Sequence, residues 1–166
     1  VFGTDDDNIY LMYDDGSIAD GFPYTTGNKI HSSPSILDIN GELIILAGSN
    51  DNHLYAINDD GSLRFSFEAS ADIKSSPSFV NHISNGYILF GDNDGNLYAI
   101  NENGELYPSF PINVGGSLIG SVVVADLDSD MFPEIIFGTD TGDMHIMHLD
   151  GSSYNQSPIP YPFSYY

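Results

Sequence analysis

The chain has 166 residues, 41% of them hydrophobic and 13% aromatic, which suits one folded domain and differs from a disordered acidic segment. Its 24 acidic residues outnumber three basic ones, and the net charge of −21 repels phosphate groups. We therefore expect no nucleic-acid partner and no membrane insertion, since no apolar run approaches the length of a membrane span. Cysteine is absent, which excludes disulfide bridges and thiolate metal sites.

The strongest pattern in the sequence is an internal repeat of roughly 45 residues. Each of four copies has a glycine that ends an apolar run: Gly3, Gly48, Gly91 and Gly138. At the same distance after each glycine the copies carry a large ring: Tyr10, Tyr55, Tyr98 and His145. Further on, each carries an Asp-Gly or Asn-Gly turn that ends in a second glycine: Gly16, Gly61, Gly104 and Gly151. Such turns are strong hairpin signals, so each copy is expected to be a β-hairpin unit.

Strands are predicted in the same order in every copy. The first copy has strands at 9–13 and 21–24. The second has an opening strand at 33–36 and further strands at 43–47, 54–58 and 65–67. The third has strands at 76–79, 87–90, 97–101 and 110–112, and the fourth at 120–123, 134–137 and 144–148.

These strands predict an all-β protein, because no window shows helical periodicity. Four short antiparallel strands per repeat are typical of β-propeller blades. We therefore predict a β-propeller of about four blades, one of them incomplete, over residues 1–30, 31–73, 74–117 and 118–166. The first copy lacks its opening strand, and exposed strand edges recruit partners. We expect the chain to belong to a longer polypeptide or to a homo-oligomer.

A loop in the fourth copy has the pattern D-x-D-x-D-x-x-x-E, formed by Asp126, Asp128, Asp130 and Glu134. Alternate carboxylates from a tight loop can converge on one hard cation, and Ca²⁺ prefers six to eight oxygen ligands. The loop is predicted to lie between strands, and Phe137 stands where an EF-hand needs a bidentate glutamate. The sequence therefore predicts a calcium site that is not an EF-hand.

This run, residues 125–139 followed by Asp150-Gly151, resembles the FG-GAP/VCBS repeats. These repeats build the propellers of integrin α-subunit heads and of many secreted bacterial proteins. Gly21-Phe22-Pro23 is also similar to a segment of the bacterial members. The resemblance implies a β-propeller, a calcium loop where the acidic pattern is complete, and an extracellular role in binding or scaffolding.

Carried over position by position, the resemblance assigns Asp126, Asp128, Asp130 and Glu134 as side-chain ligands of calcium. It assigns the carbonyl of Phe132 as a backbone ligand. The chain departs from the family at Met131, where glycine is usual and a positive φ would disfavour methionine. The corresponding segment of the second copy, 38–42, keeps fragments of the loop, and that of the third copy, 81–85, has no carboxylate, so one site is expected.

Other polar groups are interpreted as structural. His145 and His148 lie three residues apart on a strand and point to opposite faces, so a shared zinc ion is not expected. His145 occupies the position of the repeated tyrosines, which are predicted to pack in the core. The acidic turns at 5–7, 92–94 and 140 are interpreted as solubilising turn residues.

No phosphate loop, dinucleotide fingerprint or nucleophile elbow appears in the sequence, so the chain itself is not expected to be an enzyme. We expect a calcium-binding extracellular module that binds a protein or a cell surface within a larger secreted protein. The alternative is a carbohydrate-binding propeller, either a lectin or an accessory domain of a polysaccharide-degrading enzyme. The sequence does not identify the ligand.

Overall fold

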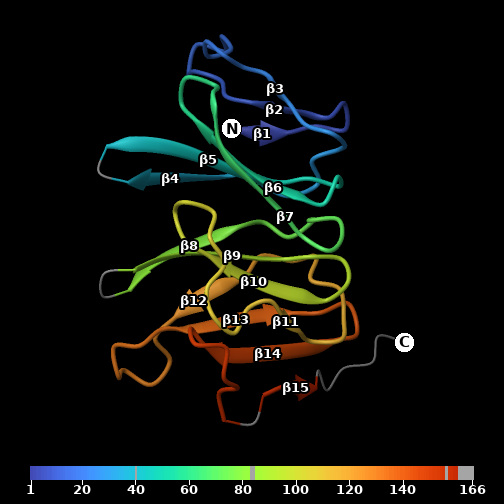
Figure 1. The fold of residues 1–166 in the computed structure, drawn as a ribbon, viewed down its shortest axis with the longest axis vertical. Coiled ribbons are helices and arrows are strands. Elements are labelled where there is room, and N and C mark those ends of the chain that lie inside the picture. The colour runs from blue at the N-terminus through green and yellow to red at the C-terminus, as the bar shows by residue number, and fades with distance from the viewer. Residues whose placement is uncertain (40, 83–84, 156, 161–166) are drawn as a thin grey trace.

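The computed structural model of the chain describes residues 1–39, 41–82, 85–155 and 157–160. All regular structure in these ranges is β, and the strands form four antiparallel sheets that follow one another along the molecule (Figure 1). The prediction of an all-β fold with about four blade-like sheets, one of them incomplete, is confirmed. The described ranges contain no helix long and apolar enough to cross a membrane.

Each sheet uses its strands in chain order. The first sheet has three strands, β1 (Phe2–Gly3), β2 (Asn8–Tyr10) and β3 (Tyr24–Thr25). The second has β4 (Ser35–Ile39), β5 (Glu42–Gly48), β6 (His53–Asn58) and β7 (Leu63–Glu68). The third has β8 (Ser78–His82), β9 (Asn85–Gly91), β10 (Asn96–Ile100) and β11 (Ile112–Asn113). The fourth has β12 (Val123–Ala125), β13 (Glu134–Gly138), β14 (Asp143–His148) and β15 (Ile159–Pro160).

The strand register explains why a ring recurs after each glycine. The residue before the glycine lies opposite that ring, in the pairs Phe2–Tyr10, Ala47–Tyr55, Phe90–Tyr98 and Phe137–His145. Three of these pairs stack, with ring centroids 5.1, 5.0 and 5.1 Å apart. Cross-strand aromatic pairs stabilise a sheet, so one sequence spacing produces the same contact in three sheets.

Among the described residues, the apolar core is divided into three clusters, one between each pair of consecutive sheets. Ile9 of the first sheet packs with Ile45 and Ile57 of the second. Leu46 and Leu54, on the other side of the second sheet, pack with Phe90 of the third. The last cluster joins the third and fourth sheets and contains Leu89, Leu97, Ile135, Phe137 and Met147. Inner sheets therefore bury both faces, whereas the first and last sheets lie at opposite ends of the molecule (Figure 1).

The repeated ring positions differ in burial. Tyr98 is 3% exposed, as predicted for a core residue, and His145 is also buried, but Tyr10 and Tyr55 are half-buried. The Tyr98 hydroxyl donates to Asp92 Oδ2 at 2.9 Å. The interpretation of Asp92 as a solubilising turn residue is wrong, because its carboxylate is fully buried and also accepts hydrogen bonds from Asn96. The Tyr55 hydroxyl also donates to a turn carboxylate, Asp51 Oδ2, at 2.7 Å.

The first strands of neighbouring four-stranded sheets are tied together at one edge. Ser35 Oγ donates to the carbonyl of Pro77 at 2.6 Å, and Ser78 Oγ donates to the carbonyl of Val122. At the other end of β8, the ring of His82 lies 4.9 Å from that of Phe132 in the loop that follows β12. This arrangement positions the acidic loop against the third sheet.

We expect His145 to make the stability of the fold depend on pH. Burial lowers the pKa of His145 below the ordinary histidine value, against a smaller opposite effect of Asp143. Protonation of His145 therefore favours the unfolded chain. Neutral His145 contributes its full stabilisation above the unfolded pKa of about 6.5, and this contribution declines as the pH falls below that value. In His145→Phe, which keeps a ring on Phe137, the melting temperature should fall less between pH 7.5 and pH 5.5 than in the parent. Equal falls in both proteins would contradict this prediction.

Candidate functional site

The candidate site is the loop between β12 and β13, which projects from the edge of the fourth sheet (Figure 1). Ala125 and Glu134 are register partners at its base, so the ladder holds both ends of the loop. Residues 126–133 therefore form the connection of a β-hairpin. A loop fixed at both ends returns on itself, which brings alternate side chains close together.

Three of the predicted ligands converge. Asp126, Asp128 and Asp130 each place one carboxylate oxygen within 4.8 Å of the others, and all three side chains are exposed. Backbone amides also organise the loop: Asp126 accepts from Ser129 N at 2.7 Å and from Met131 N at 3.0 Å. Oxygens at this separation from side chains of a single loop can coordinate one cation together.

Met131 adopts the positive φ that is expected at a position where the resembling repeats have glycine. Its φ is +72°, in the left-handed region that glycine adopts most readily. The methionine side chain is 80% exposed, so the loop accepts it without a steric clash in the core. The departure from glycine at this position therefore costs conformational energy but leaves the turn of the acidic loop intact.

Glu134, the fourth predicted side-chain ligand, lies beneath the loop and does not join the cluster of exposed oxygens. Its side chain is fully buried, and Oε2 accepts a hydrogen bond from Leu127 N at 2.9 Å. Oε1 has no hydrogen-bond partner, although His148 Nδ1 lies 3.4 Å away and forms an ion pair when protonated. A buried carboxylate oxygen without a partner carries a large desolvation cost, which a bound cation would offset.

Two aromatic rings, those of His148 and Tyr154, lie close to the carboxylates of Glu134 and Asp128. His148 and Tyr154 have ring centroids 5.3 Å apart. Burial, followed by the charges of Asp128 and Glu134, raises the pKa of Tyr154. A neutral tyrosine close to both carboxylates can donate a hydrogen bond without adding charge to the site.

A hollow of about 610 Å³ separates the acidic loop from the third sheet. Asp130 and Phe132 line it from the loop, His148 from β14, and His82 and Tyr87 from the third sheet. The rings of His82 and Phe132 are 4.9 Å apart, and His82 Nε2 is buried without a hydrogen-bond partner. Carboxylate, imidazole and aromatic groups therefore share one concave surface.

Sequence reasoning located the acidic loop but missed its neighbours. The structure brings Asp126, Asp128 and Asp130 together, buries Glu134 outside this cluster and turns Phe132 towards the third sheet. His82 and Tyr87 come from another repeat whose hairpin carries no carboxylate, so no local pattern marked them. In that hairpin residues 83 and 84, and in the second copy residue 40, lie outside the described residues.

No protein-family model and no curated protein sequence matches the chain. Among solved structures, BBS1N in complex with ARL6DN, soaked with lead, superposes with a TM-score of 0.71 at 12% identity, covering 95% of this chain and 50% of that chain. The mercury-soaked form of the same complex gives a TM-score of 0.62 at 13% identity, over 96% and 51% of the two chains. BamB from Moraxella catarrhalis gives 0.61 at 15% identity, over 92% and 43%.

These similar structures are β-propellers, so the likeness shows the propeller fold of this chain. At such low identity the likeness extends to fold alone. The chain spans about half the length of the solved proteins that it matches. The resemblance to FG-GAP/VCBS repeats stays a prediction beyond the shared propeller architecture.

Proposed function

We propose that this chain is a calcium-binding β-propeller module that binds a protein or a cell surface as part of a larger secreted protein. The observation that carries the proposal is the convergence of three aspartate carboxylates in a loop whose Leu127 amide also binds the buried, partly unpaired Glu134 carboxylate. All four groups supply oxygen, and hard divalent cations such as Ca²⁺ prefer oxygen ligands.

In the proposed site, Asp126, Asp128 and Asp130 hold the cation, and Glu134 approaches from below through Oε1. The Phe132 carbonyl is the proposed backbone ligand. The cation would cross-link a loop whose ends are fixed by the β12–β13 ladder and would neutralise part of a strongly acidic chain. Its role is structural, and the chain is proposed to have no catalytic activity of its own.

Calcium should raise the melting temperature, because a ligand that binds only the folded chain stabilises it by mass action. At a calcium concentration 100 times the dissociation constant, the gain is about 2.7 kcal/mol. Melting should be measured in calcium and in chelator for the parent and Asp128→Ala. The control Asp14→Ala removes the same charge from an exposed turn that follows β2. Equal calcium shifts in Asp128→Ala and in the control would exclude the loop as the site.

An extracellular location fits the proposed calcium dependence, because extracellular modules bind calcium at the high concentrations found outside cells. Protein binding is supported by the fold: BBS1N, a propeller that resembles this chain, was solved in complex with ARL6DN. Fractionation of the source cells tests the location. Recovery of the protein only from the cytosolic fraction would contradict it.

A second candidate function, carbohydrate binding, is favoured by the hollow between the acidic loop and the third sheet. Tyr87 and Phe132 offer aromatic surfaces there, and Asn85 and Asp130 offer polar groups. Apolar walls with a few polar groups are typical of small-ligand sites. A glycan array with the parent and Phe132→Ala tests this function. Binding that the variant loses would support it, and the absence of reproducible binding by the parent would exclude it.

A further inference from the structure

The two end sheets expose surfaces that are buried everywhere else in the fold. We call the side of a sheet that contacts the next sheet its forward face, and the opposite side its rear face. Successive residues of a strand point to opposite sides, so each sheet has both faces. The three core clusters each join a forward face to a rear face. Among the described residues, the rear face of the first sheet and the forward face of the fourth have no such partner.

The rear face of the first sheet repeats an internal rear face. Phe2 stacks on Tyr10 as Phe90 stacks on Tyr98, with centroid distances of 5.1 and 5.0 Å. Phe90 is fully buried beneath the second sheet, whereas Phe2 is 40% exposed. Met12 is 42% exposed although its counterpart Ile100 is fully buried. The first sheet therefore presents the surface that an inner sheet buries against its predecessor.

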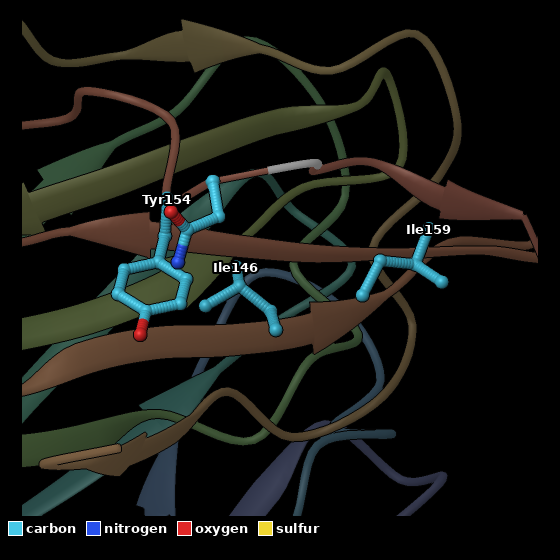
Figure 2. Close-up of a pocket in the computed structure, with 4 residues that line it drawn as sticks. Ile146, Tyr154 and Ile159 are labelled. Atoms are coloured by element: carbon cyan, nitrogen blue, oxygen red, sulfur yellow. The ribbon is translucent and has the colours of Figure 1, made fainter. Parts of the chain in front are cut away.

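The forward face of the fourth sheet presents the other half of this interface. Ile146, Tyr154 and Ile159 surround a hollow of about 500 Å³ (Figure 2). Ile159 follows a proline, as Ile112 does in the third sheet, but Ile112 packs in the cluster with the fourth sheet whereas Ile159 is 40% exposed. Apolar side chains gathered around an open hollow are typical of a surface that another protein covers.

The hairpin glycines show how such faces meet. A Cβ at Gly61 would lie 2.7 Å from Cα of Gly21 in the preceding sheet. Similarly, a Cβ at Gly104 would lie 2.7 Å from the ring of Phe65, and one at Gly151 would lie 2.5 Å from Ile112. The hairpin of each later sheet therefore packs closely against the preceding sheet. At Gly16, the equivalent glycine of the first sheet, no described atom lies within 4 Å of a Cβ.

We infer that a second copy of this chain covers these surfaces, with the forward face of the fourth sheet of one copy against the rear face of the first sheet of the other. The two surfaces are the unpaired halves of an interface that the chain already makes three times. This assignment goes beyond the proposed function and does not require calcium.

Head-to-tail packing of two copies gives a closed ring if the rotation between them completes a turn, and a linear polymer if it does not. A closed dimer forms both end interfaces at once, which favours closure over a linear pair with only one interface. The charge of −21 on each copy opposes association. Salt screens this repulsion, because the Debye length falls to about 3 Å at 1 M ionic strength. Association should therefore strengthen as salt is added.

Sedimentation of the full chain between 1 and 100 µM, in 0.05 and 0.5 M NaCl, tests the inference. The parent should reach twice its monomer mass of 18.0 kDa and should do so more readily at high salt. Met12→Asp places a charge on the rear face, and Ile159→Asp places one on the forward face. Each variant alone should be monomeric. The control Leu63→Asp changes an exposed apolar residue of an inner sheet and should associate like the parent.

Mixing the two monomeric variants gives the sharpest outcome. Met12→Asp keeps an intact forward face and Ile159→Asp keeps an intact rear face, so the mixture should form a dimer through one interface. Asp128→Ala should associate like the parent, which separates this inference from the calcium proposal. A parent that stays monomeric at 100 µM and high salt would overturn the inference. So would association that appears only after deletion of residues 161–166, which would assign the forward face to that segment.

Discussion

Replacing Tyr98 by alanine should lower the free energy of unfolding by about 3–5 kcal/mol, as for other buried aromatic residues. The ring is 3% exposed and packs between two sheets, stacked on Phe90 and edge-on to Phe67 at 5.5 Å. Its removal leaves a cavity at the interface of the second and third sheets. Chemical denaturation with an unchanged m-value would measure the loss.

The Tyr98 hydroxyl contributes separately from the ring. Burial is the largest cause of the raised pKa of Tyr98, so the hydroxyl stays protonated and donates to Asp92. Tyr98→Phe keeps the ring but removes this donor from a fully buried carboxylate, at a cost of about 1–3 kcal/mol. Tyr13→Ala, at a tyrosine that is 58% exposed, is the control and should change stability little. If Tyr98→Ala cost no more than Tyr13→Ala, the packing of the second sheet on the third would be wrong.

The sequence predicts which residues pair across the strands of one sheet, because this pairing depends only on the spacing of residues along a short segment of the chain. Once the glycine and the ring are seven residues apart across a tight hairpin, Phe90 must lie opposite Tyr98. Burial is not local, because it depends on the neighbouring sheet. Tyr55 occupies the same position as Tyr98 yet is half-buried, and it packs on Tyr24 of the preceding sheet where Tyr98 packs on Phe67. The repeat therefore predicts contacts within a sheet better than exposure between sheets.

The same division applies to the candidate site. Asp126, Asp128 and Asp130 converge because one loop carries them, and their spacing was visible in the sequence. The burial of Glu134 depends on β14, which brings His148 to 3.4 Å from its carboxylate. The contact of His82 with Phe132 depends on how two sheets pack. Spacing within a single chain segment cannot predict either contact.

The glycines show the effect of the neighbouring sheet most directly, because Gly16 and Gly61 share a backbone conformation but not an environment. Their φ angles are +85° and +81°, so alanine meets the same left-handed penalty of about 1–2 kcal/mol at both positions. Only at Gly61 would the added methyl group also overlap the backbone of Gly21. Gly21 has φ +82° and cannot move away as a flexible side chain could.

Gly61→Ala should therefore destabilise the protein more than Gly16→Ala, by about 1–3 kcal/mol, which is typical of overpacking a well-packed contact. Denaturation of both variants should be measured at low protein concentration and low salt, where a second copy does not cover Gly16. The first and second sheets would have to separate to accept the methyl group, so the added loss reports their contact alone. Equal destabilisation in the two variants would mean that the Asp60–Gly61 turn does not seat against the first sheet. Because Gly61 and Gly21 approach through backbone atoms, no change of rotamer can relieve the overlap.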